Sequence, residues 1–328
     1  MESEAFYRAL LDRLLSVDRL LLSTHRNPDP DGIGAEIGLA YLLRQKGKDC
    51  LVLNHDPLSA KLRFLDPEGT ILSFPERPPE PQLRDRTIVL LDNSDIGRSG
   101  EIEQWIAEDR SNLIVIDHHD GIVSDMKTYF LRPDIGSTSE IIQELIEFDG
   151  LPLTAAVARA LYAGLVTDTG HFRYRKTRPE SHRLAARLLE LGVDPPAVAQ
   201  RLASGFPVGR LLARRTVYDT LQVNADETMA WIVIQRKDLQ EYNVTFEDLD
   251  GLVNELLEPD QIQIAMVFVV REAGKTKVSL RSKGDVNLLP AVHAYGGGGH
   301  KNACGATIPL ELHNALREFL PVVERCLP

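Results

Sequence analysis

Residues Asn112–Gly121 read N-L-I-V-I-D-H-H-D-G. The five residues Leu113–Asp117 have the length and apolar character of a short buried strand that ends in an acid. His118 and His119 follow where this strand would open into a loop, and the backbone turn there lets both imidazoles reach one pocket. An aspartate beside two histidines offers oxygen and nitrogen ligands, which suits Mn²⁺, Fe²⁺ or Zn²⁺. The alternative is that Asp117 caps a helix and that the histidines are merely exposed.

The composition favours a two-domain globular protein. The chain has 328 residues, 43% of them hydrophobic, and a formal net charge of −11. This acidic balance argues against a protein that coats long nucleic acid. Basic residues nevertheless outnumber acidic ones in the segments 171–215 and 271–301, which permits a local anion-binding site.

The sequence also indicates a compartment. No apolar run approaches the roughly 18 residues that a membrane helix needs, and the first residues lack the pattern of a signal peptide. The three cysteines are widely scattered, so a disulfide framework is not expected. We therefore expect a cytoplasmic protein without a membrane partner.

Short apolar segments alternate with helical patterns in the first half of the chain. The expected strands are 19–25, 49–54, 70–74, 87–92 and 113–117, and the expected helices are 6–15, 32–47, 101–108, 139–148, 154–166 and 182–191. This alternation predicts an α/β fold with a parallel sheet covered on both faces. Ligands of such sheets bind beyond the carboxyl ends of the strands.

The pattern changes after residue 192, where prolines and glycines interrupt it. We expect a first domain of residues 1–192, a connection of residues 193–215 and a second domain of residues 216–328. The second domain shows strand patterns at 229–235, 262–270 and 275–281 and helical patterns at 245–257, 288–295 and 310–325. It is therefore predicted to be a smaller mixed α/β domain, with a cleft between it and the first.

Polar residues gather at the predicted sheet edge. His25, Asp29 and Asp31 share one loop at a helix entrance, with i, i+4, i+6 spacing. Asp92 ends a predicted strand, and Asp168 follows the helix predicted at 154–166. Each residue alone has a structural alternative, as a turn or a cap, but together they predict a metal site.

Charge counting favours two metal ions. The four aspartates of this group carry four negative charges, which two divalent cations would neutralise; without cations they would repel one another and raise each other's pKa. Two ions about 3.5–4 Å apart would activate a water molecule and bind phosphoryl oxygens. Carboxylate and imidazole ligands without thiolate favour Mn²⁺ over a structural zinc ion.

In this order the motifs resemble those of the DHH phosphoesterase superfamily. They are H-x-x-x-D-x-D from His25, the strand-end Asp92, D-H-H at 117–119 and Asp168 in T-D-T-G. The second half resembles the DHH-associated C-terminal domain through L-R-S-K at 280–283 and G-G-G-G-H-K at 296–301. Within the superfamily, the chain resembles most the bifunctional oligoribonuclease and pAp phosphatase (nanoRNase) group, over nearly its whole length.

The resemblance implies a role for each of these residues. Six residues would hold two Mn²⁺ ions: His25 and Asp29 one ion, Asp31, His118 and Asp168 the other, with Asp92 bridging both. His119 would contact the substrate phosphate as a hydrogen-bond donor or general acid, so that His119 and Asp92 are the catalytic residues, and Asp117 would orient an imidazole.

The second domain would bind the substrate through Arg281 and His300 and through the glycines Gly297, Gly298 and Gly299. Consecutive glycines can adopt positive φ and bring N–H groups close to an anion. A flexible surface loop is the alternative for this run.

The resemblance implies a Mn²⁺-dependent phosphoesterase. Its substrates would be short RNA (nanoRNA), linear dinucleotides such as pApA, and pAp, each hydrolysed by attack of a two-metal-activated hydroxide on phosphorus. Long nucleic acid would bind poorly, and the protein could form a homodimer. The alternatives are a cyclic-dinucleotide phosphodiesterase, a family II inorganic pyrophosphatase, against which the G-G-G-G-H motif argues, and a nucleotide-binding module without turnover.

Overall fold

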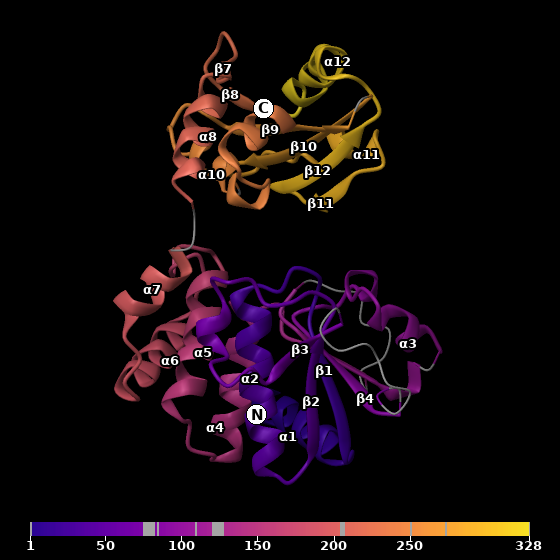
Figure 1. Ribbon diagram of the computed structural model, residues 1–328, viewed down its shortest axis with the longest axis vertical. Helices are drawn as coiled ribbons and strands as arrows, with labels where there is room; N and C mark the ends of the chain where they lie inside the picture. The colour runs from indigo at the N-terminus through magenta and orange to yellow at the C-terminus, as the bar shows by residue number, and fades with distance from the viewer. Residues whose placement is uncertain are drawn as a thin grey trace. The chain divides into compact units, whose positions relative to one another are not determined.

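A computed structural model describes residues 2–74, 83, 85–108, 110–119, 128–203, 207–249, 251–272 and 274–327. The chain divides into two units, residues 1–205 (unit 1) and 206–328 (unit 2). Each unit contains its own six-stranded sheet (Figure 1). Among the described residues, no helix is both long and apolar enough to cross a membrane.

The sheet of unit 1 is entirely parallel, as predicted. Its strands are β1 (Arg19–Ser23), β2 (Asp49–Asn54), β3 (Ile71–Ser73), β4 (Thr87–Leu91), β5 (Leu113–Asp117) and β6 (Tyr129–Leu131). Their spatial order is β3-β2-β1-β4-β5-β6, and every pairing is parallel. The order reverses between β1 and β4, and the carboxyl ends of strands at such a switch point form a ligand-binding crevice.

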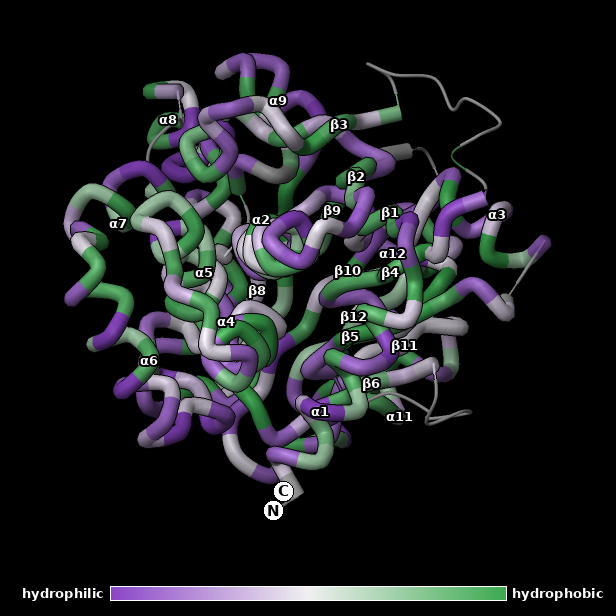
Figure 2. Tube along the Cα trace, turned by 90° about the horizontal axis from the view of Figure 1, so that it is seen from below, coloured by the Kyte–Doolittle hydropathy of each residue, from purple (hydrophilic) through white to green (hydrophobic). Residues whose placement is uncertain are grey.

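Helices cover both faces of this sheet, because side chains of each strand alternate between two hydrophobic clusters. In β1, Leu20 and Leu22 join the larger cluster, whereas Leu21 joins the smaller one. The larger cluster is built with α1 (Glu2–Leu15), α2 (Pro30–Gln45), α4 (Thr138–Asp149), α5 (Ala155–Asp168), α6 (Pro179–Glu190) and α7 (Pro195–Ala203). The smaller cluster lies under α3 (Ile102–Glu108). Helix α6 accordingly carries both hydrophobic and hydrophilic residues (Figure 2), and its buried residues Leu184, Ala185 and Leu188 face the sheet domain.

Unit 2 is a smaller domain of helices and strands, as predicted, and its sheet has both parallel and antiparallel pairings. Its strands are β7 (Gln222–Val223), β8 (Met229–Gln235), β9 (Ile264–Glu272), β10 (Lys275–Ser282), β11 (Gly298–His300) and β12 (Ala303–Ile308), in the order β11-β12-β10-β9-β8-β7. Only the pairing of β8 with β9 is parallel among those described. The helices are α8 (Val208–Tyr218), α9 (Arg236–Tyr242), α10 (Leu252–Leu256), α11 (Leu289–His293) and α12 (Leu312–Glu324).

The prediction of one continuous helix at 245–257 is wrong. The chain forms a 3-10 turn at Glu247–Leu249 and then the short α10, because Gly251 adopts a left-handed conformation with φ of 92°. The start of the segment is capped as its residues suggest: Asp248 accepts a hydrogen bond from the N–H of Thr245 (2.7 Å) and donates its own N–H to the Thr245 hydroxyl (3.4 Å).

The segment expected to connect the domains contains two helices. α7 packs on unit 1 through the buried Val198, and α8 packs on unit 2 through Ala213 and Val217. The prolines at the start of this segment lie in the first turn of α7, where a missing N–H costs nothing, so they begin a helix there. Residues 204–206, between the two helices, lie outside the described residues.

Candidate metal centre

The carboxyl edge of the unit 1 sheet gathers all eight polar residues that the sequence places there. His25 follows β1, Asp92 follows β4, and Asp117, His118 and His119 end β5 or follow it; Asp29 and Asp31 begin α2, and Asp168 ends α5. Most of these side chains are buried. Two sets of three residues have ligand atoms close enough to hold a metal ion: His25, Asp29 and Asp92, and Asp31, His118 and Asp168.

The first set contains an imidazole whose tautomer is fixed by the backbone. His25 Nδ1 lies 2.7 Å from the carbonyl oxygen of Arg26, so Nδ1 carries the proton and donates it. The lone pair of Nε2 then faces Oδ2 of Asp29 (3.5 Å) and Oδ2 of Asp92 (3.6 Å). The two carboxylate oxygens of Asp29 have different partners. Oδ1 accepts the N–H of Asp31 (2.9 Å) as the cap of α2, and Oδ2 remains available to a metal ion.

The second set has the same arrangement around His118. Its Nδ1 lies 3.3 Å from the carbonyl oxygen of Ile135, and its Nε2 points to Oδ2 of Asp168 (2.9 Å), Oδ1 of Asp92 (3.5 Å) and Oδ2 of Asp31 (3.9 Å). The buried Nε2 atom makes no hydrogen bond among the described residues, despite its short distance to Asp168. A buried imidazole lone pair surrounded by carboxylate oxygens fits a bound cation.

Asp92 belongs to both sets. Its Oδ2 faces His25 and its Oδ1 faces His118, and Oδ1 also accepts the hydroxyl hydrogen bond of Thr138 (3.0 Å). Leu91 points to the face of the sheet that α2 covers, so a continued strand would send Asp92 to the opposite face. Asp92 instead adopts a left-handed backbone with φ of 56°, a conformation that costs about 1–2 kcal/mol for an L-residue. This conformation is typical of residues held at functional sites.

The N-terminus of α4 holds Asp31, a contact that the sequence analysis missed. The N–H of Thr138 donates to Oδ2 of Asp31 (2.6 Å) and the N–H of Ser139 to Oδ1 (2.8 Å). Ser137 caps the same helix, since its hydroxyl oxygen accepts the N–H of Glu140 (3.0 Å). The positive end of a helix therefore faces a fully buried carboxylate. No local spacing relates Asp31 to residues more than 100 positions away.

The buried charges perturb one another strongly. Burial and the nearby Asp92 raise the pKa of Asp31 and of Asp168 above their usual range. Burial lowers the pKa of His25 and of His118, but contacts with the surrounding carboxylates outweigh it and raise the two values to about 10 and about 11. Burial alone would raise the pKa of Asp92, yet its contacts with both histidines lower it. The pocket thus has excess negative charge, and its nitrogen and oxygen donors suit a divalent transition metal.

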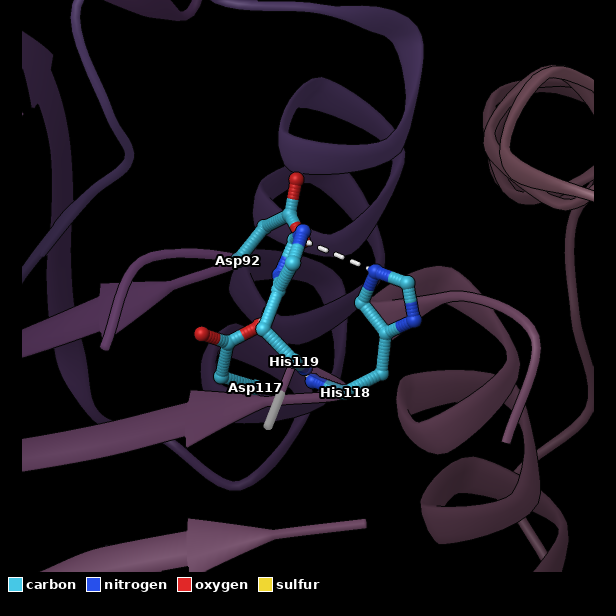
Figure 3. Close-up of side chains that lie close together, drawn as sticks. All are labelled: Asp92, Asp117, His118 and His119. Carbon is cyan, nitrogen blue, oxygen red and sulfur yellow. Dashed lines mark hydrogen bonds and ion pairs between the residues drawn. The ribbon is translucent and has the colours of Figure 1, made fainter. Parts of the chain in front are cut away.

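The carboxylate of Asp117 accepts hydrogen bonds from the side chain of His119 and from three backbone N–H groups. Its Oδ1 accepts the N–H of His118 (2.7 Å), the N–H of His119 (3.1 Å) and Nδ1–H of His119 (2.8 Å), and its Oδ2 accepts the N–H of Ser94 (2.7 Å). The contact with Asp117 raises the pKa of His119. The side chain of His119 is 38% exposed, so its Nε2 remains available to a substrate. Figure 3 shows both histidine rings reaching toward Asp92.

The residues predicted to bind the nucleotide lie in unit 2. Arg281 is a half-buried residue of β10, and its Nη1 donates to the carbonyl of Leu280 (3.0 Å). No ion pair joins its guanidinium to a carboxylate among the described residues. A guanidinium without a carboxylate partner is compatible with binding of a phosphate.

The glycine run forms part of a strand. Gly298–His300 is β11, which pairs with β12, and both Gly298 and His300 are exposed. A Cβ atom at Gly297 would lie 2.3 Å from the carbonyl oxygen of Gly305, and Gly299 has φ of 134°, which L-residues rarely adopt. Strand packing therefore requires glycine at 297 and 299, whatever these residues bind. Their role in substrate binding remains a prediction.

Comparison with known proteins agrees with this geometry. Residues 19–165 match the DHH family, N-terminal domain, and residues 228–327 match the DHHA1 domain. The bifunctional oligoribonuclease and PAP phosphatase NrnA of Thermus thermophilus is 30% identical over 93% of this chain and 89% of its own. A protein of Streptococcus mutans named probable bifunctional oligoribonuclease and PAP phosphatase NrnA is 27% identical, over 92% of this chain and 93% of its own.

The fold also recurs in a solved structure. An exopolyphosphatase-related protein from Bacteroides fragilis superimposes with a TM-score of 0.89, covering 98% of this chain and 96% of that chain. The two sequences are 24% identical, so this likeness concerns the fold.

Proposed function

The chain belongs to the DHH family of metal-dependent phosphoesterases, and on this premise we propose that it hydrolyses short oligoribonucleotides, linear dinucleotides such as pApA, and pAp. The support for these substrates is its similarity, over most of both chains, to relatives named bifunctional oligoribonucleases and PAP phosphatases. The proposal includes two Mn²⁺ ions as cofactors and a cytoplasmic location.

The observation that carries the proposal is the shared position of Asp92. Its two carboxylate oxygens face two different sets of ligand atoms, one around His25 and one around His118. A bridging carboxylate of this kind is what a pair of closely spaced cations requires. Oxygen and imidazole ligands without a cysteine favour Mn²⁺ over a structural Zn²⁺.

Two bound divalent cations would supply the positive charge that lowers the pKa of a water molecule and neutralises a phosphoryl group. The residues of the chain prepare the site for this chemistry. Arg26 and Ile135 accept the Nδ1 protons of His25 and His118 and so direct each Nε2 into the pocket. The N-terminus of α4 holds Asp31 in place with two backbone hydrogen bonds.

His119 has a different task, because it is the more exposed of the two neighbouring histidines. Asp117 accepts its Nδ1 proton and fixes the ring, which leaves Nε2 directed away from Asp117. In its protonated form, Nε2 would donate a proton to the oxygen that leaves phosphorus. In unit 2, Arg281 and His300 would bind the phosphate or the base of the nucleotide.

A substrate panel with Mn²⁺ tests the proposal. The panel contains pAp, pApA, RNA of three to five nucleotides, a long RNA, a cyclic dinucleotide and pyrophosphate. We expect release of mononucleotides from the short RNAs and of phosphate from pAp, and slow turnover of the long RNA. Preferred hydrolysis of the cyclic dinucleotide or of pyrophosphate would replace the proposal by that alternative. Binding of pAp without any Mn²⁺-stimulated product would identify a nucleotide-binding module.

A further inference from the structure

Part of the sheet in unit 2 lacks a helical cover on one face. On that face α8, α9 and α10 pack on β8 and β9, and no described residue of β10, β11 or β12 belongs to their hydrophobic cluster. The opposite face is covered along β8, β9, β10 and β12 by α11 and α12. Lys277, Ser279 and Arg281 alternate with buried residues of β10 and therefore point to the face that these helices leave open.

A pocket of about 340 Å³ lies where the open face meets the helices. Its lining includes the apolar residues Phe246, Leu252 and Val267 and the β10 residues Lys277, Ser279 and Arg281. We call this cavity the Lys277 pocket. Apolar side chains together with two cations suit a nucleotide, which has a flat base and a phosphate.

The two cations of the pocket, Lys277 and Arg281, have no carboxylate partner among the described residues. In the sheet Lys277 lies between Thr307 and Val269, and Arg281 lies between two alanines, so none of the paired neighbours is acidic. Neither cation forms an ion pair within the described residues, whereas Lys301 of the same unit pairs with Asp285 (2.8 Å). Two cations without a carboxylate partner in the described part of the chain favour an anionic ligand.

The spacing of the cations indicates how much of a substrate they span. Lys277 and Arg281 are four residues apart on one strand, which places their Cα atoms roughly 13 Å apart. Successive phosphates of RNA are separated by a single sugar and lie closer together than this, so the span fits phosphates that are two linkages apart, as in a trinucleotide.

We propose that the Lys277 pocket binds a second nucleotide of the substrate, next to the one that Arg281 contacts. Lys277 and Ser279 contact the next phosphate along the strand, which a trinucleotide carries and which pAp and pApA, with two phosphates each, lack. Phe246 contacts the base of the second nucleotide. The inference rests on the proposed function and deepens it, because it explains how one protein can accept both pAp and short RNA. A substrate with two phosphates, pAp or pApA, reaches Arg281 but not Lys277, whereas a trinucleotide reaches both.

Replacing Lys277 by Ala tests this assignment. We expect kcat/KM for a trinucleotide to fall about tenfold through a higher KM, since a hydrogen bond to a charged group is lost. For pAp and pApA we expect kcat/KM to stay within about twofold of the wild-type value. The dependence of log kcat/KM on log salt concentration should become less steep by about 0.7 for the trinucleotide, because one phosphate contact on a single strand is removed.

Lys275→Ala is the matched control. Lys275 is an exposed lysine of the same strand and does not line the pocket, so all its kinetic constants should equal those of the wild type. Equal thermal melting curves for the two variants and the wild type show that each is folded.

The outcomes separate this inference from the proposed function. If the wild-type protein hydrolyses neither pAp nor pApA, the proposed function itself fails. If it hydrolyses both and Lys277→Ala behaves like Lys275→Ala, the second-nucleotide site alone is overturned. An equal loss for pAp and for the trinucleotide also overturns it, because the pocket would then bind the first nucleotide.

Discussion

Replacing Asp92 by Asn removes the carboxylate that faces both sets of ligand atoms. Asparagine has nearly the same shape, and its carbonyl oxygen can still accept the hydrogen bond from Thr138. Asparagine is also among the few residues that tolerate a left-handed backbone, so φ of 56° at this position should persist. The substitution therefore changes charge and ligand strength without a new steric conflict.

The structure allows an estimate of the effect. The side chain of Asp92 is only 2% exposed and lies within 3.6 Å of His25 and of His118. Removal of one partner from such a buried charged group costs about 3–5 kcal/mol. At 1.4 kcal/mol for each factor of ten, cation affinity should fall roughly 10²- to 10⁴-fold. We expect kcat/KM for pAp to fall by at least about 10²-fold at a Mn²⁺ concentration that saturates the wild-type protein.

Thermal melting with and without Mn²⁺ measures the loss of binding independently of activity. At a Mn²⁺ concentration of 100 times Kd, a bound ion adds about 2.7 kcal/mol to the free energy of unfolding of the wild-type protein. In unit 1, this corresponds to an increase of about 5–10 °C in Tm. A variant whose Kd is raised 100-fold retains only about 0.4 kcal/mol of this stabilisation.

Asp95→Asn is the matched control for this experiment. Asp95 is an exposed aspartate of the same loop, and its carboxylate accepts the N–H of Gly97 (3.1 Å). Replacing Asp95 by Asn should therefore leave activity and the stabilisation by Mn²⁺ unchanged. The reasoning is refuted if Asp92→Asn retains kcat/KM within tenfold of the wild type and the full increase in Tm with Mn²⁺.

Three further predictions concern protons, packing and the leaving group. Protonated His25 and His118, with pKa values of about 10 and about 11 in the metal-free protein, contribute stability that is complete below pH 6.5 and is lost as pH rises toward 10. Tm in EDTA should therefore fall between pH 7 and 9.5. The increase in Tm caused by Mn²⁺ should become larger over the same range, because Mn²⁺ competes with protons for the histidines. An increase in Tm that does not depend on pH would contradict this. In Gly164→Ala the added Cβ would lie 2.1 Å from Oγ of Ser139, so denaturant unfolding should show a loss of about 1–3 kcal/mol, and a second substitution, Ser139→Ala, should restore part of it; full additivity of the two losses would show that this contact is not the cause. His119→Ala should lower kcat about 10²- to 10⁴-fold with unchanged Mn²⁺ binding by calorimetry, and an equal loss of Mn²⁺ affinity would make His119 a ligand and not a proton donor.

The sequence predicts the parallel sheet well, because its strands are buried on both faces and end in polar residues. The strand predicted at 113–117 has the observed bounds of β5, and 49–54 those of β2. β6, β7, β11 and β12 were not predicted: the first three have two or three residues, and β12 consists mostly of small residues without a clear hydrophobic alternation. The interruption at Gly251 reflects a backbone conformation that hydrophobic periodicity does not reveal.

The sequence also predicts which residues meet at the sheet edge, because parallel strands end on the same side. It does not predict the partners of Asp31. Its two backbone donors, Thr138 and Ser139, reach it only because α4 packs against α2, and that contact depends on tertiary structure. The left-handed turn at Asp92 likewise depends on its neighbours, since aspartate at a strand end usually remains extended.

The central claim is that unit 1 holds two cations that share Asp92. Anomalous X-ray scattering at the manganese absorption edge, from crystals soaked in Mn²⁺, tests it most directly. The account predicts two peaks about 3.5–4 Å apart, both in contact with the Asp92 carboxylate, with one beside His25 and the other beside His118. A single peak, or manganese bound away from Asp92, would contradict it.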